Sequence, residues 1–122
     1  MNSGDSKEEV LITIMGQVNC SDLSESMRWF EALFRRPPDA RPMDGLVEWH
    51  HGAGGLQLCK NVADAGHSAL TLIVSDVTEM IGGLREAGLP TGEVEAGDHA
   101  SIMRLSDPDE NLIVLAQYYS DT

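Results

Sequence analysis

Histidine is a common metal ligand, and this chain contains four of them. His50 and His51 are adjacent on a predicted strand, where successive side chains point to opposite faces, so they cannot bind one ion. His67 precedes another predicted strand, where it either lines the mouth of a pocket or is exposed to solvent, and His99 is expected to be exposed in an acidic turn. Because no His-x-x-x-His or Cys–His spacing occurs, these residues do not predict a zinc site.

Nucleophilic side chains are present, but the sequence gives no sign of groups that would activate them. Ser68, Ser101 and Cys59 have no cue for a paired base and an orienting acid. The segment Gly52-Ala53-Gly54-Gly55 leads into a strand pattern and not into a helix, so it predicts a hairpin turn rather than a phosphate-binding loop. We therefore predict no catalytic residue.

Gln57 is the most informative polar residue. It lies between Leu56 and Leu58, and an unpaired amide on a half-buried strand face is unfavourable. Gln57 is therefore expected either to hydrogen-bond a ligand or to bond a neighbouring backbone group or an ordered water. Trp49 either forms a stacking wall for a planar ligand or belongs to the core.

Methionine and glutamate side chains on the predicted strands are also open to two interpretations. Met15, Met43 and Met103 could give a pocket an adaptable lining, or they are core residues. Glu48 and Glu95 could neutralise a cationic ligand, or they are solvated surface charges.

The elements that must position these residues follow one pattern twice. In each half a strand is followed by a helix with an Asp-x-x-Glu cap, beginning at Asp22 and again at Asp76, and then by further strands. Gly88 is expected to follow the end of the second helix. The first half comprises a strand at 10–19, a helix at 24–34, either an edge strand or a loop at 39–44, and a hairpin of strands at 46–51 and 55–60. The second half comprises strands at 68–75, 91–95, 100–105 and 112–118, with the helix following the first of them.

This internal duplication predicts an α+β fold of two βαβββ repeats. One repeat leaves a sheet face uncovered, so the two repeats must pair, either within one chain or by exchange between two chains. The predicted organisation is a flexible tail (1–9) and a single domain (10–118), with repeat one at 10–60, a linker at 61–66 and repeat two at 67–118.

The segment Ser106–Gln117 combines a tight Asp-Pro-Asp-Glu-Asn turn with an apolar strand. This hairpin resembles the closing hairpin of the vicinal oxygen chelate superfamily, which includes glyoxalase I, bleomycin resistance proteins and extradiol dioxygenases. The resemblance extends from Leu11 to Tyr118 and implies a cupped, mostly antiparallel sheet with the helices outside. The superfamily turn usually has Gly where this chain has Glu110, and a Glu at positive φ would destabilise the turn by about 1–2 kcal/mol.

The resemblance also implies where a metal would bind. Metal-dependent members place ligands on the first and last strand of each repeat, at positions occupied here by Met15, Gln57, Ala69 and Val114. Three of these side chains offer no hard donor, so we expect no metal and no other cofactor.

The resemblance to the metal-free, bleomycin-resistance-like branch implies a protein that binds or sequesters a small organic molecule, cationic or aromatic, in the cup of the sheet. The expected ligand-binding residues are Gln57, Trp49, Met15, Gln17, His67, Thr71, Met103 and Val114. The alternatives are a metal-dependent lyase, isomerase or dioxygenase that recruits His67 and Gln57, and a purely structural dimer. Small members of the superfamily generally pair, so a homodimer is expected.

Composition narrows the partners further. The chain has 20 acidic and 8 basic residues, a formal net charge of −12, and would repel nucleic-acid phosphates. No apolar run is long enough to span a membrane, and the polar start of the chain has no signal-peptide pattern. Cys20 and Cys59 are expected to be reduced, which favours a cytoplasmic location; a disulfide between them is the alternative.

Overall fold

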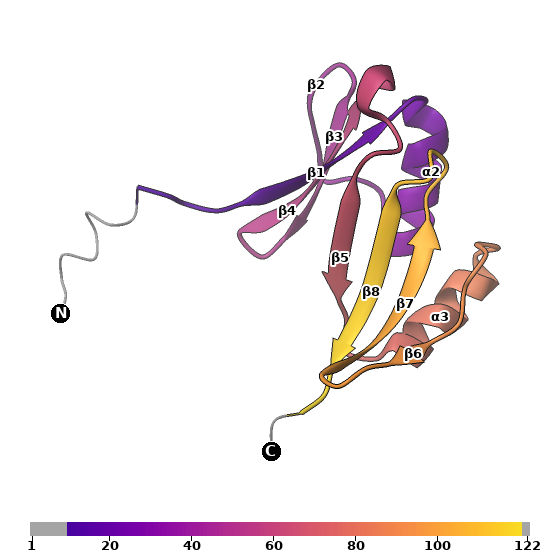
Figure 1. Ribbon diagram of the computed structural model, residues 1–122. Coiled ribbons are helices and arrows are strands. Elements are labelled where there is room, and N and C mark those ends of the chain that lie inside the picture. The colour runs from indigo at the N-terminus through magenta and orange to yellow at the C-terminus, as the bar shows by residue number, and fades with distance from the viewer. Residues whose placement is uncertain (1–9, 121–122) are drawn as a thin grey trace, which may run out of the picture.

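The computed structural model describes residues 10–120, which form two four-stranded sheets with one helix packed on each (Figure 1). The predicted tail Met1–Glu9 lies outside these residues. The first repeat contains β1 (Met15–Cys20), α2 (Leu23–Phe34), β2 (Ala40–Met43), β3 (Leu46–His51) and β4 (Gly54–Lys60). A short 3-10 turn, η1 (Val62–Asp64), leads to the second repeat: β5 (Ala69–Ile73), α3 (Val77–Glu86), β6 (Glu95–Ala96), β7 (Ala100–Ser106) and β8 (Leu112–Tyr118).

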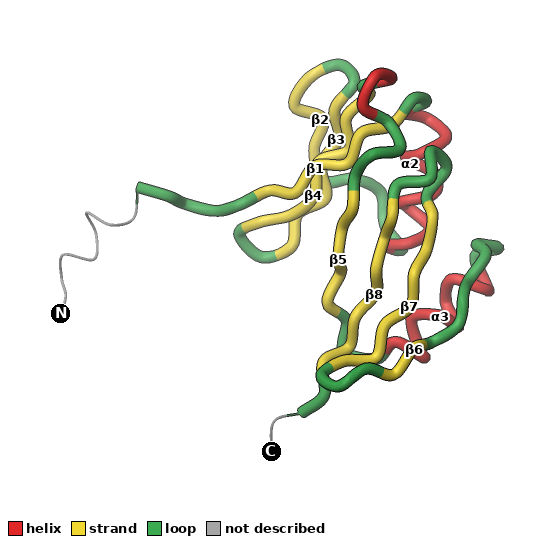
Figure 2. The backbone as a smooth tube through the Cα atoms, viewed as in Figure 1, coloured by secondary structure: helices red, strands yellow, loops and turns green. Residues whose placement is uncertain are grey.

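The two sheets have the same topology. Sheet 1 has the strand order β1-β4-β3-β2 and sheet 2 the order β5-β8-β7-β6. In both, the first strand pairs parallel to the last, and the remaining pairs are antiparallel. Figure 2 shows the two sheets meeting near β1 and β5, with the strands of one running across those of the other. The predicted α+β fold of two βαβββ repeats is thus confirmed. Within residues 10–120, neither helix has the length and hydropathy needed to cross a membrane.

Three predicted strands are shorter than expected, and the one predicted at 68–75 is β5 (Ala69–Ile73). The first begins at Met15 rather than at Val10, because in this register residues 10–13 would lie beyond the start of β4 at Gly54. The predicted strand at 91–95 is reduced to β6 (Glu95–Ala96), since the amide of Gly92 bonds the sulfur of Met103 and not a neighbouring strand.

The helix caps follow the repeat. Asp22 accepts a hydrogen bond from the amide of Glu25 at 3.1 Å, and Asp76 accepts one from the amide of Glu79 at 3.0 Å. These bonds satisfy amides at the start of each helix that have no partner within the helix itself. Gly88, with φ 83°, follows α3 as predicted.

The turn between β7 and β8 makes hydrogen bonds to the first repeat. Asn111 is fully buried, and its side-chain amide donates to the carbonyl of Asn19 at 2.8 Å while its oxygen accepts from the amide of Ser68 at 2.8 Å. The carboxylate of Asp109 accepts from the amide of Ser21 at 3.0 Å. We call this group around Asn111 the inter-repeat clasp, because it ties the β7–β8 turn of repeat two to the end of β1. Burial raises the pKa of the neighbouring Asp107.

Candidate functional site

Each sheet has one face that its helix does not cover, called here the free face. On sheet 1 the register aligns Gln17, Gln57 and Glu48 across three neighbouring strands, so these side chains share the free face. On sheet 2 the register likewise aligns Thr71, Val114 and Arg104. The free face of β5 remains open to solvent, with Ile73 59% exposed.

The free face of sheet 1 carries a hydrogen-bonded polar cluster. The side-chain amide of Gln57 donates to one carboxylate oxygen of Glu48 at 2.7 Å, and Nε2 of His50 lies 2.9 Å from the other. The bond from Gln57, and then that from His50, lowers the pKa of the Glu48 carboxyl below its usual value. Glu48 is therefore ionised at neutral pH, with its side chain only 16% exposed.

The free face of sheet 2 is mainly apolar. Ala69, Ile73, Val114 and Ala116 lie in register on β5 and β8, together with Leu112, which is 38% exposed. Glu95 forms an ion pair with Arg104 at the outer side of this sheet. The two free faces thus offer different chemistry: a charged hydrogen-bonding cluster on sheet 1 and apolar contact surface on sheet 2.

Four side chains occupy the positions at which the resemblance places metal ligands. Met15 and Gln57 lie on the free face of sheet 1, and Ala69 and Val114 on that of sheet 2. Gln57 alone offers an oxygen donor, whereas a divalent cation needs several converging hard donors. Across residues 10–120 no three His, Cys, Asp or Glu side chains come close enough to hold an ion.

The structure separates two of the predicted ligand-binding residues from the others. Trp49 is fully buried on the helix side of sheet 1, where its ring lies 5.3 Å from that of Phe34 and its Nε1 donates to the carbonyl of Arg36 at 3.0 Å. Met103 is fully buried on the helix side of sheet 2. Trp49 is paired with Leu56, whereas Gln57 is paired with Glu48, so a shift of one residue along the strand changes the face. Both are core residues, and the expectation that they contact a ligand in the cup is corrected.

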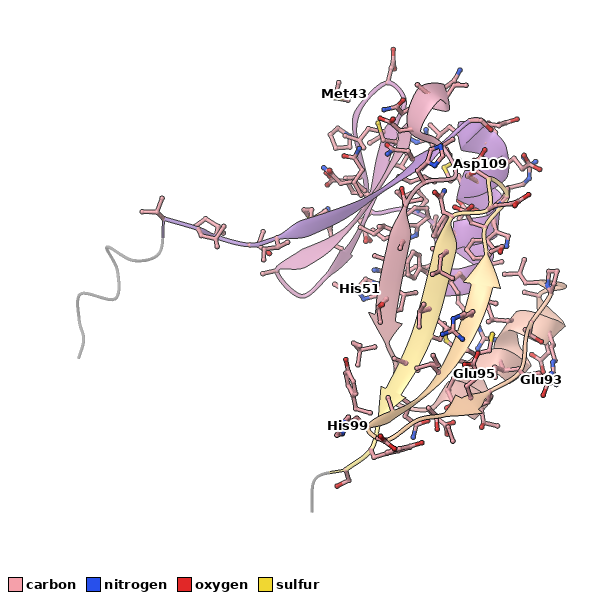
Figure 3. All side chains as sticks on the ribbon, in the orientation of Figure 1. Met43, His51, Glu93, Glu95, His99 and Asp109 are labelled. Carbon is pink, nitrogen blue, oxygen red and sulfur yellow. The ribbon has the colours of Figure 1, made fainter. Side chains whose placement is uncertain are left out.

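The remaining predicted residues are divided between the two free faces. Gln17 donates to the side-chain oxygen of Asn19 at 3.0 Å beside Gln57, and His67 is exposed just before β5. The expected separation of the adjacent histidines is confirmed, since His50 bonds Glu48 while the ring of His51 lies 5.6 Å from that of Phe34. Figure 3 places His51 near β5, far from His99.

Sequence reasoning named Glu48 and Gln57 separately but missed that they bond each other. The signal was present, because counting outward from the Gly52-Ala53 turn pairs residue 48 with residue 57. It also missed a cavity of about 480 Å³ between the two repeats, lined by both helices and both sheets, which of the predicted residues only Thr71 lines. Its lining residues come from both repeats and so could not be grouped from strand periodicity.

Similarity to solved structures supports the fold. A glyoxalase / bleomycin resistance protein from Catenulispora acidiphila DSM 44928 superposes with a TM-score of 0.81 at 22% identity, over 88% of this chain and 98% of that one. TnmS3, an antibiotic binding protein from Streptomyces sp. CB03234, gives a TM-score of 0.76 at 20% identity, over 90% and 99% of the two chains. Lactoylglutathione lyase from Agrobacterium tumefaciens gives 0.74 at 13% identity, over 88% and 93%.

These similarities lie in the three-dimensional structure. No family model matches the sequence, and no curated protein matches it either. At 13–22% identity the likeness is one of fold, and the fold is that of the vicinal oxygen chelate superfamily, as the closing hairpin indicated.

Proposed function

We propose that this chain uses the vicinal oxygen chelate fold to bind a small organic molecule, cationic or aromatic, at its free faces, and that sequestration is its function. The observation that carries the proposal is Glu48, an ionised and largely shielded carboxylate held by Gln57 and His50. A fixed negative charge of this kind favours a ligand with a cationic group, because such a group gains a charge-assisted hydrogen bond. The net charge of −12 acts in the same direction at longer range.

The apolar free face of sheet 2 would hold the organic body of the ligand. Exposed apolar side chains such as Ile73 and Leu112 would gain from being covered by a ring or a hydrocarbon. The names of two similar structures, an antibiotic binding protein and a glyoxalase / bleomycin resistance protein, support a small organic ligand rather than a macromolecule.

Binding without a resident metal is part of the proposal. It is supported by the residues at the expected metal-ligand positions, because Gln57 is the one that offers an oxygen donor among Met15, Gln57, Ala69 and Val114. We expect elemental analysis of protein purified without chelator to find no stoichiometric transition metal, and EDTA to leave the melting temperature unchanged. About one metal per chain would instead favour the alternative function, a metal-dependent lyase, isomerase or dioxygenase.

A homodimer is also proposed. The apolar side chains of Val10, Leu11, Ile12 and Ile14 are 70–86% exposed on a segment that runs away from both sheets (Figure 1). Burying them against a second copy would remove apolar surface from water. Light scattering should give twice the chain mass of 13.2 kDa at micromolar concentration, and the mass of a single chain would contradict this proposal.

A cytoplasmic location completes the proposal. Cys20 and Cys59 are free thiols, and burial raises the pKa of Cys20 to about 11, so its thiolate is scarce at neutral pH. Thiol labelling of protein freshly isolated from its native cells should find both cysteines reduced. A disulfide in that material would argue against this location.

The experiment that tests ligand binding begins with a thermal-shift screen of cationic glycopeptides, planar aromatics and 2-oxo-aldehyde adducts. A stabilising compound is then titrated against Gln57→Leu and Glu48→Gln, whose affinities should fall roughly five- to a hundredfold. Glu86→Gln on the exposed part of α3 is the matched control, because it removes the same charge away from the free faces. Equal affinity in all three variants would place the ligand elsewhere and overturn the proposed site.

A further inference from the structure

The cavity of about 480 Å³ lies between the two repeats, beside β5. Its walls come from both helices and both sheets, and they include Phe34, Leu56, Leu70, Leu72 and Met80. Leu56 is paired with Trp49, and Leu72 with Leu115, so these side chains lie on the helix side of their sheets, whereas Thr71 and Ile73, on the free face of sheet 2, also line the cavity. The volume is that of a typical small-molecule pocket, and the lining is largely apolar.

A cationic side chain lies at the rim of this cavity. Arg35 ends α2 in the left-handed region, with φ 63°, where glycine is the usual residue. A left-handed conformation is unfavourable for a side chain such as Arg, so the identity of this residue is not explained by the backbone. A cation near the C-terminus of a helix is favourable, but Arg36 next to it would also supply that charge.

The Arg35 guanidinium lies beside Gly83 of α3, a second residue whose type does not suit its local backbone. Gly83 lies inside α3, where glycine destabilises a helix relative to alanine. A Cβ at this position would lie 3.0 Å from Nη1 of Arg35 and 3.2 Å from its Cζ. Arg35 occupies a position where glycine is favoured, and Gly83 occupies a position where alanine is favoured. Together these two residues allow the Arg35 side chain to pack against α3.

The guanidinium held in this way has no fixed partner. Among residues 10–120, the side chain of Arg35 makes no hydrogen bond and no ion pair, although Asp76 and Glu79 line a smaller cavity with it. His51, whose ring lies against Phe34, also lines the large cavity, and a guanidinium nitrogen of Arg36 is 3.5 Å from Nε2 of His51. The apolar cavity is thus bordered by basic groups in a protein whose net charge is −12.

We propose that this inter-repeat cavity is a second binding site, which takes an amphipathic anion: a monocarboxylate with an apolar chain or ring. The apolar body fills the space between Leu56, Leu72 and Met80. The carboxylate lies at the rim and accepts hydrogen bonds from Arg35, whose planar guanidinium matches a carboxylate in two-point geometry. Arg35 and Gly83 then have a common role, which explains why each occupies a position where its backbone preference is poor.

The test uses the full-length protein and three ten-carbon probes that differ only in the head group: decanoate, decanol and decylamine. Isothermal titration, below the concentrations at which the probes aggregate, should show decanoate binding most tightly. Arg35→Gln should weaken decanoate binding by roughly tenfold or more and leave decanol binding unchanged. Arg28→Gln, an exposed arginine of α2, is the matched control and should bind decanoate as the wild type does.

Two further variants separate binding from folding. Arg35→Gly suits the left-handed backbone, so it should keep or raise the melting temperature while losing decanoate affinity. Gly83→Ala should also raise the melting temperature through helix propensity, yet weaken decanoate binding because the new Cβ displaces the guanidinium.

The site is distinguished from the polar free face of sheet 1 by Gln57→Leu, which should leave decanoate affinity unchanged. Failure of the free-face ligand screen therefore has no bearing on this result. Equal affinity for the three probes would overturn the proposal. Decanoate affinity that is unchanged in Arg35→Gln and Arg35→Gly would also overturn it. Loss of decanoate binding in Gln57→Leu would do so as well.

Discussion

The two repeats share one topology but divide their residues differently. On the helix side of sheet 1 the core is aromatic, with Phe30 and Trp49 fully buried, and the free face is polar around Glu48. On the helix side of sheet 2 the core is aliphatic, with Ile113 and Leu115 fully buried, and the free face is mainly apolar.

This difference shows which constraints the duplicated fold imposes on its sequence. Each sheet must bury one apolar face against its helix, and several combinations of side chains can fill that layer. The free faces carry no such constraint and can diverge. In this chain the free face of the first repeat carries the charged cluster around Glu48, and that of the second carries mainly apolar side chains.

The aromatic core of repeat one should be the more sensitive half. Trp49→Ala should lower the free energy of unfolding by about 3–5 kcal/mol, because it removes the largest buried side chain and its contacts with Phe30 and Phe34. Leu115→Ala in repeat two should lower it by about 2–5 kcal/mol, nearer the lower end if the aliphatic layer closes around the gap. Chemical denaturation measures both, and a Trp49→Ala variant of nearly wild-type stability would contradict the assignment of Trp49 to the core.

The inter-repeat clasp should come next in size. Asn111→Ala leaves the amide of Ser68 and the carbonyl of Asn19 without their buried partner, and should lower the free energy of unfolding by about 2–3 kcal/mol. Ser106→Ala, an exposed neighbour at the end of β7, should change little. If the two variants are equally stable, the clasp does not hold the repeats together.

Much of the fold could be predicted because it depends on local signals. The two Asp-x-x-Glu caps, at Asp22 and Asp76, mark both helices in register with the strands around them. The turn that contains Asn111 identified the closing hairpin, and the structure shows the tertiary reason for that residue, since its side chain bonds both repeats.

The candidate site was less predictable because it depends on which face a side chain occupies. The Trp49 side chain could lie on either face of the sheet. Its face is determined only when the register with β4 is known, because Trp49 is paired with Leu56 and its neighbour Glu48 with Gln57. Arg35 gave no signal at all, because its left-handed backbone and its proximity to Gly83 exist only in the folded chain.

The hairpin turns of the two repeats offer a smaller and cleaner comparison. Repeat one has Gly52 at φ 58° between β3 and β4, whereas repeat two has Glu110 at φ 69° between β7 and β8. Glu110→Gly should raise the free energy of unfolding by about 0.5–1 kcal/mol, because relief of the left-handed strain exceeds the extra entropy of the unfolded chain. Gly52→Glu should lower it by a similar amount, since a Cβ at Gly52 meets no atom within 4 Å and the change therefore tests the backbone alone. Thermal unfolding of the two single variants would measure both effects, and a destabilised Glu110→Gly would mean that the Glu110 side chain contributes more than its backbone loses.

The smallest expected effect concerns the charge on the polar free face. Gln57 lowers the pKa of Glu48 more than any other group does, so Gln57→Leu should raise the pKa of Glu48 toward its ordinary value. A carboxyl whose pKa is lowered by folding adds stability above its unfolded pKa and loses that stability as the pH falls through its folded pKa. In Gln57→Leu this loss should therefore begin at a higher pH than in the wild type.

Carboxyl ¹³C chemical shifts followed over an acid titration would show the change directly, with Asp39 as the internal control. The pKa of Asp39 is lowered chiefly by the amide of His50, which the variant leaves in place. A Glu48 pKa that does not move would mean that Gln57 and Glu48 do not act as a pair, and that the polar face of repeat one is no more organised for binding than the apolar face of repeat two.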